Sequence, residues 1–496
     1  MKRLYLGIDL GTSAMKIVLI DERREVLAQT TEEYQLSNPQ PGWSEIAPTL
    51  WCESMVKGIR RVLEGQNASL LRSIGFTGQM HTLVVLDGNG RCIRPAMMWN
   101  DLRTKELIPE LKESIRPFAE GDYLSRIIST GSPAANFYWL KKYEPENFAK
   151  VRKFLIGADY LVYCLTGCYG TDYCEASTSC LYEIRNQRWS AQMREFLGLE
   201  ESVYPDVHES AHESGTVTQE MAKLLGIPGT VTVLTGTGDN PAMAISTGCL
   251  GKGYPVISLG TSGVLVIPVE PERKNVYGKK ILFSFDNRKY YNLIQGVVQS
   301  NGSTLDWWIR KVLKKSDFDY IDENVDLGKA KKNRVIFYPH LVGEKTLYAD
   351  PTLRGSFIGI GTDSGQEELT YSVLEGLCFG FRELSEKMEL PLAEYGSVKV
   401  VGGGAKSSVW LQILANVLNL PVEKMSGMIG AAFGAALLTA YHDEEETDYT
   451  DIVEKTIHVE NEFLPDPEMV EICNKKYQIY KRIYNGMKYI TEDENY

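Results

Sequence analysis

The sequence predicts an α/β protein built from two similar lobes. Two observations predict this fold class. Short apolar segments typical of strands alternate with longer segments typical of helices, and one strand-turn-strand pattern occurs twice along the chain. Alternation of this kind is typical of layered α/β domains. The length of 496 residues is enough for two or three domains of ordinary size.

The repeated pattern consists of an apolar segment, the residues Leu-Gly-Thr-Ser and a second apolar segment. The first copy spans residues 4–20 and the second spans residues 254–267. Each copy is typical of a β-hairpin with a Gly-Thr-Ser turn. A four-residue match can arise by chance in a chain of this length, but the matching strands on both sides favour an internal duplication. We therefore expect two related lobes that face each other.

The rest of the chain supplies further strands and helices. Strands are expected at residues 73–76, 83–86, 154–156, 231–235, 335–338 and 398–401, and helices at residues 50–63, 136–142, 303–312, 367–388 and 408–418. Residues 430–439 are small and predict a tightly packed helix. The tail at residues 466–487 has an apolar stripe at helical spacing, in which Cys473 serves as a small apolar residue.

The boundary between the lobes is expected near residues 248–253, where three glycines fall within six residues. We expect an N-terminal lobe over residues 1–248 and a C-terminal lobe over residues 249–445. Residues 446–496 are expected to form a helical extension that packs on the body of the protein.

The composition excludes several classes of protein. The net charge of −12 disfavours a nucleic-acid partner, because an acidic surface repels phosphate backbones. No apolar run reaches the roughly 18 to 20 residues that cross a bilayer, so no membrane association is expected. Asp9 and Lys16 interrupt the first apolar segment, which is unlike a signal peptide. The nine cysteines are scattered without a CxxC pair, which indicates free thiols in a reducing compartment and hence a cytoplasmic protein.

Asp9 is the first candidate for chemistry. It lies in an apolar strand, where an unpaired carboxylate costs several kcal/mol, and a bound cation or phosphate-coordinated Mg²⁺ would compensate it. In the turn that follows, Gly11 allows a close approach of the backbone, and Thr12 and Ser13 offer hydroxyl donors. Lys16, three residues after the turn, adds a positive charge. A plain hairpin with a capped Asp is the alternative. The second turn, at Gly260, Thr261 and Ser262, repeats the arrangement and favours phosphate binding.

Two common nucleotide motifs are missing from the sequence. There is no GxxxxGK[ST] segment, and no complete GxGxxG follows a strand. A P-loop ATPase and a Rossmann dehydrogenase are therefore disfavoured.

Asp239 and Asn240 follow an expected strand and a glycine-rich turn. A carboxylate at a strand end could orient a substrate hydroxyl and accept its proton while a phosphoryl group is transferred. The alternative is an Asp that caps the next helix, which stabilises a helix by about 1 kcal/mol. Spacing alone favours the cap.

A third group of candidates offers both polar atoms and apolar faces. His81, Asn100 and Asp101 supply hydrogen-bonding groups, and Met80 and Trp99 supply apolar surface. Sugar sites combine the two, because a site that hydrogen-bonds hydroxyls rejects analogues that lack them. The alternative for His81 is a satisfied core histidine.

A glycine run ends the expected strand at residues 398–401. Gly403 and Gly404 lie in the run, and a helix is expected to begin at Ser407 or Ser408. Backbone could lie flat against a nucleotide here. A tight turn between a strand and a helix is the competing interpretation.

Taken together, these segments resemble the FGGY carbohydrate kinases over nearly the whole chain. Near the start, GIDLGTS (residues 7–13) resembles the first phosphate loop of the family. In the second half, GSFIG (355–359) and ELTYSVLE (368–375) resemble its C-terminal signature. Within the family, PGWSE (41–45), GQMH (78–81), WNDLR (99–103), GDN (238–240) and SLGTS (258–262) are most similar to kinases of D-xylulose.

The resemblance implies a fold and a set of roles. The fold would be the two-lobed actin/Hsp70-like, ribonuclease-H-like ATPase fold, with a duplicated core and the active site in a cleft between the lobes. Asp239 would be the catalytic base and Asp9 would help to hold Mg²⁺. The ketose, in the first lobe, would contact Met80, His81, Asn100, Asp101 and Asn240. ATP would lie mainly on the second lobe, with phosphates at Gly11, Thr12, Ser13, Gly260, Thr261 and Ser262 and the adenosine near Gly403, Gly404 and Ser408.

Three alternatives to a D-xylulose kinase remain. The first is a family kinase of another ketose, a polyol or a sugar acid. The second is an actin- or Hsp70-like protein ATPase, although no segment is free to form a peptide-binding domain. The third is an inactive sugar sensor, which would not need paired phosphate turns. For the predicted kinase, a monomer or a homodimer is expected.

Overall fold

The computed structural model describes residues 3–249, 253–269, 277–284, 290–344, 346–348, 350, 352–390, 392–426, 430–444 and 456–491. Residues 250–252 of the expected lobe boundary and residues 446–455 at the start of the expected extension lie outside the described part of the chain. The described residues form two compact units.

Unit 1 comprises Met1–Gly248, Lys279–Leu293 and Met428–Thr456, and unit 2 comprises Cys249–Gly278, Ile294–Gly427 and Ile457–Tyr496. This division differs from the linear boundary expected after residue 248. The reason is packing between segments that are distant in sequence. β18 (Lys279–Ser284) packs on α7 (Tyr173–Thr178), and α15 (Ala431–Asp443) packs on β1 (Leu4–Leu10) and β5 (Leu71–Gly78).

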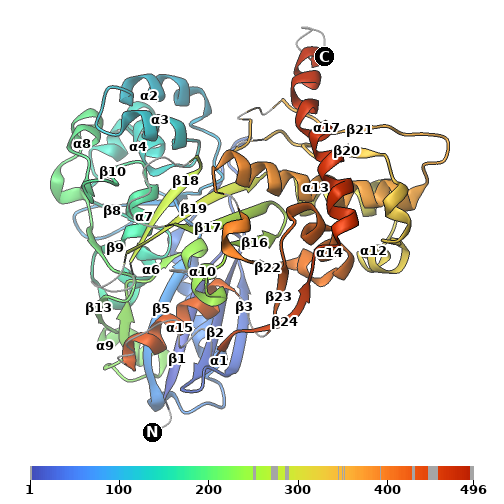
Figure 1. The fold of residues 1–496 in the computed structure, drawn as a ribbon. Coiled ribbons are helices and arrows are strands. Elements are labelled where there is room, and N and C mark those ends of the chain that lie inside the picture. The colour runs from blue at the N-terminus through green and yellow to red at the C-terminus, as the bar shows by residue number, and fades with distance from the viewer. Residues whose placement is uncertain are drawn as a thin grey trace. The chain divides into compact units, whose positions relative to one another are not determined.

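The remaining elements of unit 1 alternate between strands and helices (Figure 1). The strands are β2 (Ala14–Asp21), β3 (Val26–Glu33), β4 (Glu45–Ile46), β6 (Leu83–Leu86), β7 (Ala96–Met97), β8 (Lys153–Ile156), β9 (Gly170–Asp172), β10 (Tyr182–Glu183), β11 (Arg188–Trp189), β12 (Asp206–His208), β13 (Glu213–Thr216), β14 (Thr232–Leu234) and β15 (Thr237–Gly238). The helices are α1 (Pro48–Leu63), α2 (Ile108–Ile115), α3 (Gly121–Ile127), α4 (Pro133–Tyr143), α5 (Pro145–Phe148), α6 (Asp159–Thr166), α8 (Ala191–Leu197), α9 (Gln219–Leu225) and α10 (Asp239–Thr247).

The main sheet of unit 1 has the strand order β13-β14-β5-β1-β2-β3, and β15 also pairs with β5. β1 and β2 are antiparallel and are joined by the expected Gly-Thr-Ser turn, so the first predicted hairpin is confirmed. β1, β14 and β15 each run parallel to β5, which makes β5 the centre of the parallel part of the sheet.

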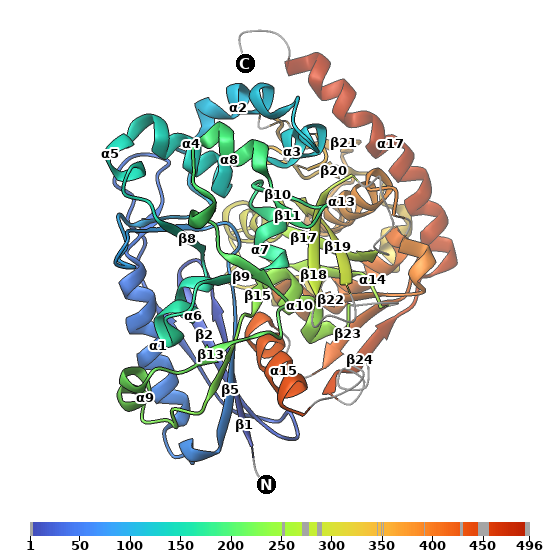
Figure 2. The same cartoon turned by 90° about the vertical axis from the view of Figure 1, so that its left-hand side faces the viewer.

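α15 lies against β1 and β5 at a distance that only small residues allow, and α10 runs beside it (Figure 2). A Cβ added to Gly7 of β1 would lie 1.9 Å from the carbonyl oxygen of Ala432. A Cβ on Gly434 would lie 1.9 Å from the carbonyl oxygen of Ala242 in α10. The prediction that residues 430–439 form a tightly packed helix is therefore confirmed.

Unit 2 contains β16 (Val256–Leu259), β17 (Gly263–Val269), β20 (Ile336–Tyr338), β21 (Ser356–Ile358), β22 (Val398–Val401), β23 (Val422–Ser426), β24 (His458–Phe463) and the later part of β19 (Tyr290–Val298). Its helices are α11 (Gly302–Asp306), a π-helical turn at Trp307–Val312, α12 (Asp319–Asn324), α13 (Gln366–Lys387), α14 (Ser408–Leu418) and α17 (Pro467–Thr491). The helix expected at residues 303–312 therefore changes its hydrogen-bonding pattern at Trp307.

The two main sheets share one topology, which confirms the internal duplication. The second sheet has the order β18-β19-β17-β16-β22-β23-β24. β16 and β17 form an antiparallel hairpin, and β16 is followed outward by the parallel strands β22 and β23. In the same way, β1 pairs with β2 on one side and with the parallel strands β5 and β14 on the other.

Each unit has its own apolar core. In unit 2, the stripe on α17 contributes Cys473, Tyr477 and Tyr480, all with 0 % exposure, as the spacing in the tail predicts. In unit 1, one core lies around β1 and β5, and a second lies around β6, β8 and α4. No helix in the described part of the chain is both long enough and apolar enough to span a membrane.

The cysteines depart from expectation at one point. Cys52 of α1 and Cys164 of α6 form a disulfide within unit 1, and the other seven cysteines are free. The expectation that all nine are free thiols is therefore wrong for this pair. The two residues are 112 positions apart, so only the packing of α1 against α6 brings them together.

Candidate functional site

The expected site residues of unit 1 follow three neighbouring parallel strands. β1 and β5 are in register with Asp9 opposite Thr77, and Thr237 of β15 lies opposite Thr77 on the same strand. The turn at residues 11–13 follows β1, residues 79–81 follow β5, and Asp239 follows β15. Ligands of open α/β sheets bind at the carboxyl ends of such strands. The structure thus brings Asp9, His81 and Asp239 to one edge.

The carboxyl groups of Asp9 and Asp239 act on each other electrostatically. Burial raises the pKa of Asp9 to about 7, the charge of Asp239 adds to this shift, and Lys16 opposes it. Lys16 is the cross-strand partner of Asp9 in the hairpin of β1 and β2. A cation bound beside Asp9 would therefore stabilise the ionised form of its carboxyl group.

Asp239 is the first residue of α10, and Gly238 rather than Asp239 takes the N-cap position. Burial raises the pKa of Asp239 to about 6, while the backbone N–H of Asn240 and the charge of Lys279 oppose this shift. The Oδ1 atom of Asp239 is buried and has no hydrogen-bond partner among the residues that the structure describes. A buried acceptor without a partner is costly, so this atom is suited to receive a substrate hydroxyl.

Met80 and Asn240 lie together beside Asp239. The amide Nδ2 of Asn240 contacts Sδ of Met80 at 3.4 Å, and the Met80 side chain is 6 % exposed. A Cβ on Gly238 would lie 2.7 Å from Cγ of Met80 and 2.8 Å from Sγ of Cys174. Only glycine therefore permits this packing of the turn against Met80.

His81 has an unusual backbone and an incomplete set of hydrogen bonds. Its φ angle is +75°, a left-handed conformation that costs of order 1–3 kcal/mol for most residues other than glycine and is concentrated at functional sites. Its backbone N–H donates to Oε2 of Glu175 at 3.2 Å, and its ring Nε2 is hydrogen-bonded to Nζ of Lys279. Its ring Nδ1 is buried and has no partner among the described residues. The hydrogen-bonding capacity of the His81 ring is therefore only partly used by the described part of the protein.

The WND segment at residues 99–101 divides into an exposed and a buried part. Nε1 of Trp99 donates to the hydroxyl of Thr12 at 3.0 Å, and Asn100 is exposed. Asp101, in contrast, is fully buried, and its two oxygens accept four hydrogen bonds at 2.7–2.8 Å from Arg103 and from the N–H of Ser44. A carboxylate has about four acceptor sites, so those of Asp101 are filled by the protein itself.

In unit 2, the second set of expected residues follows the parallel strands β16 and β22. The turn at residues 260–262 is held by α11, because the N–H groups of Gly302 and Ser303 donate to Gly260 and Thr261 at 3.0 Å each. A Cβ added to Gly403 would have no atom of the described residues within 4 Å, which indicates open space beside it. α14 begins at Ser408 with Ser407 as its N-cap, as predicted.

Sequence reasoning missed two charged residues near His81. Lys279 opens β18 and Glu175 lies in α7, far from every motif that the sequence presents. Neither residue stands in a recognisable pattern. Only the folding of β18 onto α7 reveals their place in the site.

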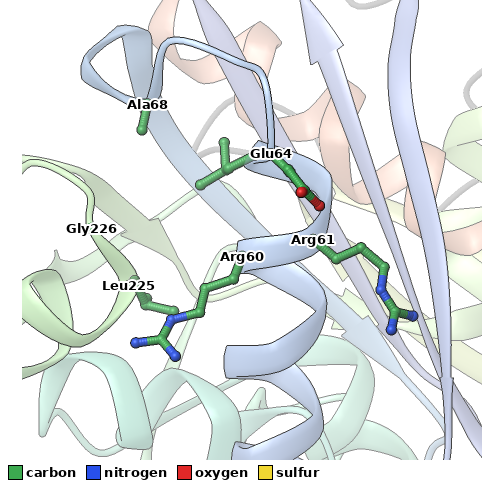
Figure 3. Close-up of a pocket in the computed structure, with 7 residues that line it drawn as sticks. Arg60, Arg61, Glu64, Ala68, Leu225 and Gly226 are labelled. Carbon is green, nitrogen blue, oxygen red and sulfur yellow. The ribbon is translucent and has the colours of Figure 1, made fainter.

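A surface pocket of unit 1 lies apart from these residues. It is lined by Arg60, Arg61, Leu63, Glu64, Ala68, Leu225 and Gly226, and the two guanidinium groups point away from each other (Figure 3). Nε of Arg60 donates to the carbonyl of Leu224 at 2.9 Å, and Arg61 pairs with Glu32. Both cations therefore already have partners.

Two related α/β units each carry a Gly-Thr-Ser turn after a strand of their main sheet, and the N–H groups of such turns suit the phosphates of a nucleotide. The N-terminal domain model of the FGGY family of carbohydrate kinases matches residues 4–246, and the C-terminal domain model matches residues 256–442. The chain belongs to the FGGY family of carbohydrate kinases. It is therefore an ATP-dependent carbohydrate kinase, and the resemblance noted in the sequence is confirmed.

Relatives of known name match the chain over nearly its full length. The xylulose kinase of Staphylococcus epidermidis is 32% identical, and the match covers 99% of this chain and 98% of that protein. The xylulose kinase of Bacillus subtilis is 30% identical over 98% of this chain and 97% of that protein.

A solved structure confirms the fold class. The crystal structure of a xyloylose kinase from Brucella ovis has a TM-score of 0.89 and 31% identity, and the match covers 98% of this chain and 100% of that one. The expected actin/Hsp70-like ATPase fold is therefore confirmed, and a protein ATPase without a sugar substrate is excluded by the family.

Proposed function

We propose that this chain transfers the γ-phosphoryl group of ATP to D-xylulose and releases ADP and D-xylulose 5-phosphate. The observation that carries the proposal is the convergence of Met80, His81, Asp239 and Asn240 at one sheet edge of unit 1, with Oδ1 of Asp239 buried and unpartnered. The choice of sugar is supported by the similarity to proteins named xylulose kinase at about 30% identity.

The sugar would bind on unit 1 through groups of different character. Met80 offers an apolar surface, and His81, Asn100 and Asn240 offer hydrogen-bonding groups. Asp101 would act indirectly, because its bonds to Arg103 and Ser44 fix the loop from which Trp99 and Asn100 project. A site built to bond hydroxyl groups discriminates strongly against sugars that lack them.

Asp239 would act as the general base. Its unpartnered oxygen would accept a hydrogen bond from the terminal hydroxyl of the sugar, and it would take the proton as the oxygen attacks the γ-phosphorus. The bond between the γ-phosphorus and the β,γ-bridging oxygen breaks, and ADP leaves. Water must be kept away from the γ-phosphate during this step to prevent hydrolysis of ATP.

Asp9 fits a divalent cation that arrives with the nucleotide. No group of three or more His, Cys, Asp or Glu side chains in the described residues is arranged to hold a metal. Mg²⁺ does not need such a group, since it is commonly held by one or two carboxylates together with substrate phosphates and water. Bound there, Mg²⁺ would neutralise charge on the phosphates. The raised pKa of Asp9 is consistent with this role, because a cation would favour its ionised form.

The nucleotide would lie mainly on unit 2. Gly260, Thr261 and Ser262 would face its phosphates, and Gly403, Gly404 and Ser408 would lie near the adenosine. On unit 1, the turn of Gly11, Thr12 and Ser13, with Lys16 behind it, would contact the transferred phosphoryl group. Turn N–H groups of this kind attract anions.

An ADP-release assay with a panel of sugars tests the proposal. Purified protein would be assayed with D-xylulose, ribulose, fuculose, glycerol and gluconate, each with ATP and Mg²⁺. We expect the highest kcat/KM with D-xylulose. A clear preference for another ketose, a polyol or a sugar acid would overturn the choice of sugar, and ATP turnover that does not depend on any sugar would overturn the reaction itself.

We further propose a cytoplasmic enzyme that is a monomer or a homodimer. Phosphorylation of xylulose would be a step of pentose catabolism, and it would consume ATP. Size-exclusion chromatography with light scattering would distinguish a mass of 55.7 kDa from its double.

A further inference from the structure

Lys279 lies beside His81 of the proposed sugar site, although it belongs to no recognisable sequence motif. It is the first residue of β18, it is only partly exposed, and its Nζ atom is hydrogen-bonded to Nε2 of His81. β18 is held in place on α7, because the N–H of Leu282 donates to Oγ of Ser177 at 3.1 Å and the strand packs along the helix. The position of Lys279 is therefore fixed by the fold of unit 1.

The chemistry of this contact restricts where the protons lie. An ammonium group has donors and no acceptor, whereas a neutral imidazole has one donor nitrogen and one acceptor nitrogen. If Lys279 is charged, Nε2 of His81 must accept, and the ring hydrogen must lie on Nδ1. Nδ1 is the buried ring nitrogen for which the described part of the chain supplies no partner.

Burial and the neighbouring groups have opposite effects on the charge of Lys279. Burial lowers the pKa of Lys279, but neighbouring groups oppose this shift. In order of effect, the opposing groups are Cys180, Cys174, Glu175 and Asp239. Burial also lowers the pKa of His81 well below its ordinary value, and the charge of Lys279 adds to this effect. Because a lysine amine is far more basic than an imidazole, a single proton held by the pair lies on Lys279, and His81 is neutral.

We propose that Lys279 is a positioning residue that holds His81 as the neutral Nδ1–H tautomer, so that His81 donates a hydrogen bond from Nδ1 to an acceptor oxygen of the sugar. The proposal rests on the proposed sugar kinase function and adds a residue to it. The left-handed backbone of His81 and its N–H bond to Glu175 fix the base of the side chain, and Lys279 fixes its tip. The hydrogen bond that one ring nitrogen of a histidine makes commonly decides whether the other nitrogen carries the hydrogen.

Nitrogen-15 NMR of the histidine rings in the wild-type protein tests the tautomer directly. The chain has six histidines, and the His81 signals would be assigned by their loss in His81→Gln. We expect a neutral ring with its hydrogen on Nδ1. A hydrogen on Nε2, or a doubly protonated ring at neutral pH, would overturn the proposal. This measurement needs neither a sugar nor a Lys279 variant that folds.

Kinetics of Lys279 variants test the consequence for the sugar. Lys279→Met keeps most of the side-chain volume but removes the donor, so we expect KM for the sugar to rise about tenfold, as for the loss of one hydrogen bond, while KM for ATP stays unchanged. Lys279→Arg, which keeps a donor, should recover part of the loss. Lys280→Met is the matched control, because adjacent residues of a strand point to opposite faces.

The two proposals fail in distinguishable ways. If the panel of sugars shows another preferred substrate, the kinetic comparison is made with that sugar and the tautomer result still stands. If Lys279→Met binds the preferred sugar as well as the wild type, Lys279 is not a positioning residue, whatever the identity of the sugar. A variant that also loses ATP affinity would indicate a general structural defect and would contradict the specific role.

Discussion

Nε1 of Trp99 donates a 3.0 Å hydrogen bond to the hydroxyl of Thr12. This bond joins two motifs that the sequence presents separately, the WND segment of the proposed sugar site and the Gly-Thr-Ser turn of the proposed phosphate site. Both ends lie in unit 1. It links the part of the site that would hold the acceptor to the part that would hold the transferred group.

Trp99→Phe should lower kcat/KM for the sugar by about three- to tenfold, because it removes one hydrogen bond and keeps an aromatic face. Thr12→Val should produce a loss of its own, and the double variant should lose less than the sum of the two. Steady-state kinetics of the four proteins form a double-mutant cycle. Strict additivity would show that the bond between Trp99 and Thr12 has no role in activity.

Activity should fall as the pH drops below neutrality. The pKa of Asp9 is raised to about 7 and that of Asp239 to about 6, both chiefly by burial. A general base and a cation ligand both act as carboxylates, so protonation of either residue inactivates the free enzyme. The pH profile of kcat/KM should therefore show an acid limb between about pH 6 and 7.

The contrary result is a profile that stays flat down to pH 5, where a carboxyl group with an ordinary pKa is still mostly ionised. Circular dichroism at each pH is the control, because the fold must persist while activity is lost. Replacing Lys279 by Met should move the acid limb to higher pH, since its positive charge lowers the pKa of Asp239.

Two adjacent glycines of unit 2 should respond differently to a methyl group. Gly402 has φ of +93°, and an added Cβ would lie 2.9 Å from the carbonyl oxygen of Leu259, so Gly402→Ala should destabilise the protein by more than about 1 kcal/mol. Gly403 has open space beside it, so Gly403→Ala should leave the melting temperature nearly unchanged.

If the adenosine lies against this turn, Gly403→Ala should nevertheless raise KM for ATP severalfold without changing KM for the sugar. Thermal unfolding and steady-state kinetics of both variants check the expectation. An unchanged KM for ATP in Gly403→Ala would argue against a nucleotide at this turn.

Much of the fold follows from local patterns in the sequence. Both Gly-Thr-Ser hairpins, the small-residue helix and the stripe on the C-terminal helix are set by residues close together in the chain, and the structure confirms each of them. The assignment of α15 to unit 1 could not be predicted in this way. It depends on contacts with Gly7 and Gly75, more than 300 positions earlier in the chain.

The site, like the fold, could be predicted from the sequence only in part. The sequence motifs predicted that Met80, His81 and Asp239 belong to one site. They did not predict that Arg103 fills the hydrogen-bonding capacity of Asp101, or that Lys279 is hydrogen-bonded to His81. These relationships depend on where side chains point once distant segments have packed. The cleft between the lobes, with ATP on one side and sugar on the other, stays a prediction.

The central claim is that Asp239 takes the proton of the sugar hydroxyl during phosphoryl transfer from ATP. The most direct test is kcat for D-xylulose phosphorylation by Asp239→Asn and Asp239→Ala, with unchanged thermal unfolding as the control for folding. We expect kcat to fall roughly 10²- to 10⁴-fold in both variants. Turnover close to that of the wild type in a folded Asp239 variant would contradict the account.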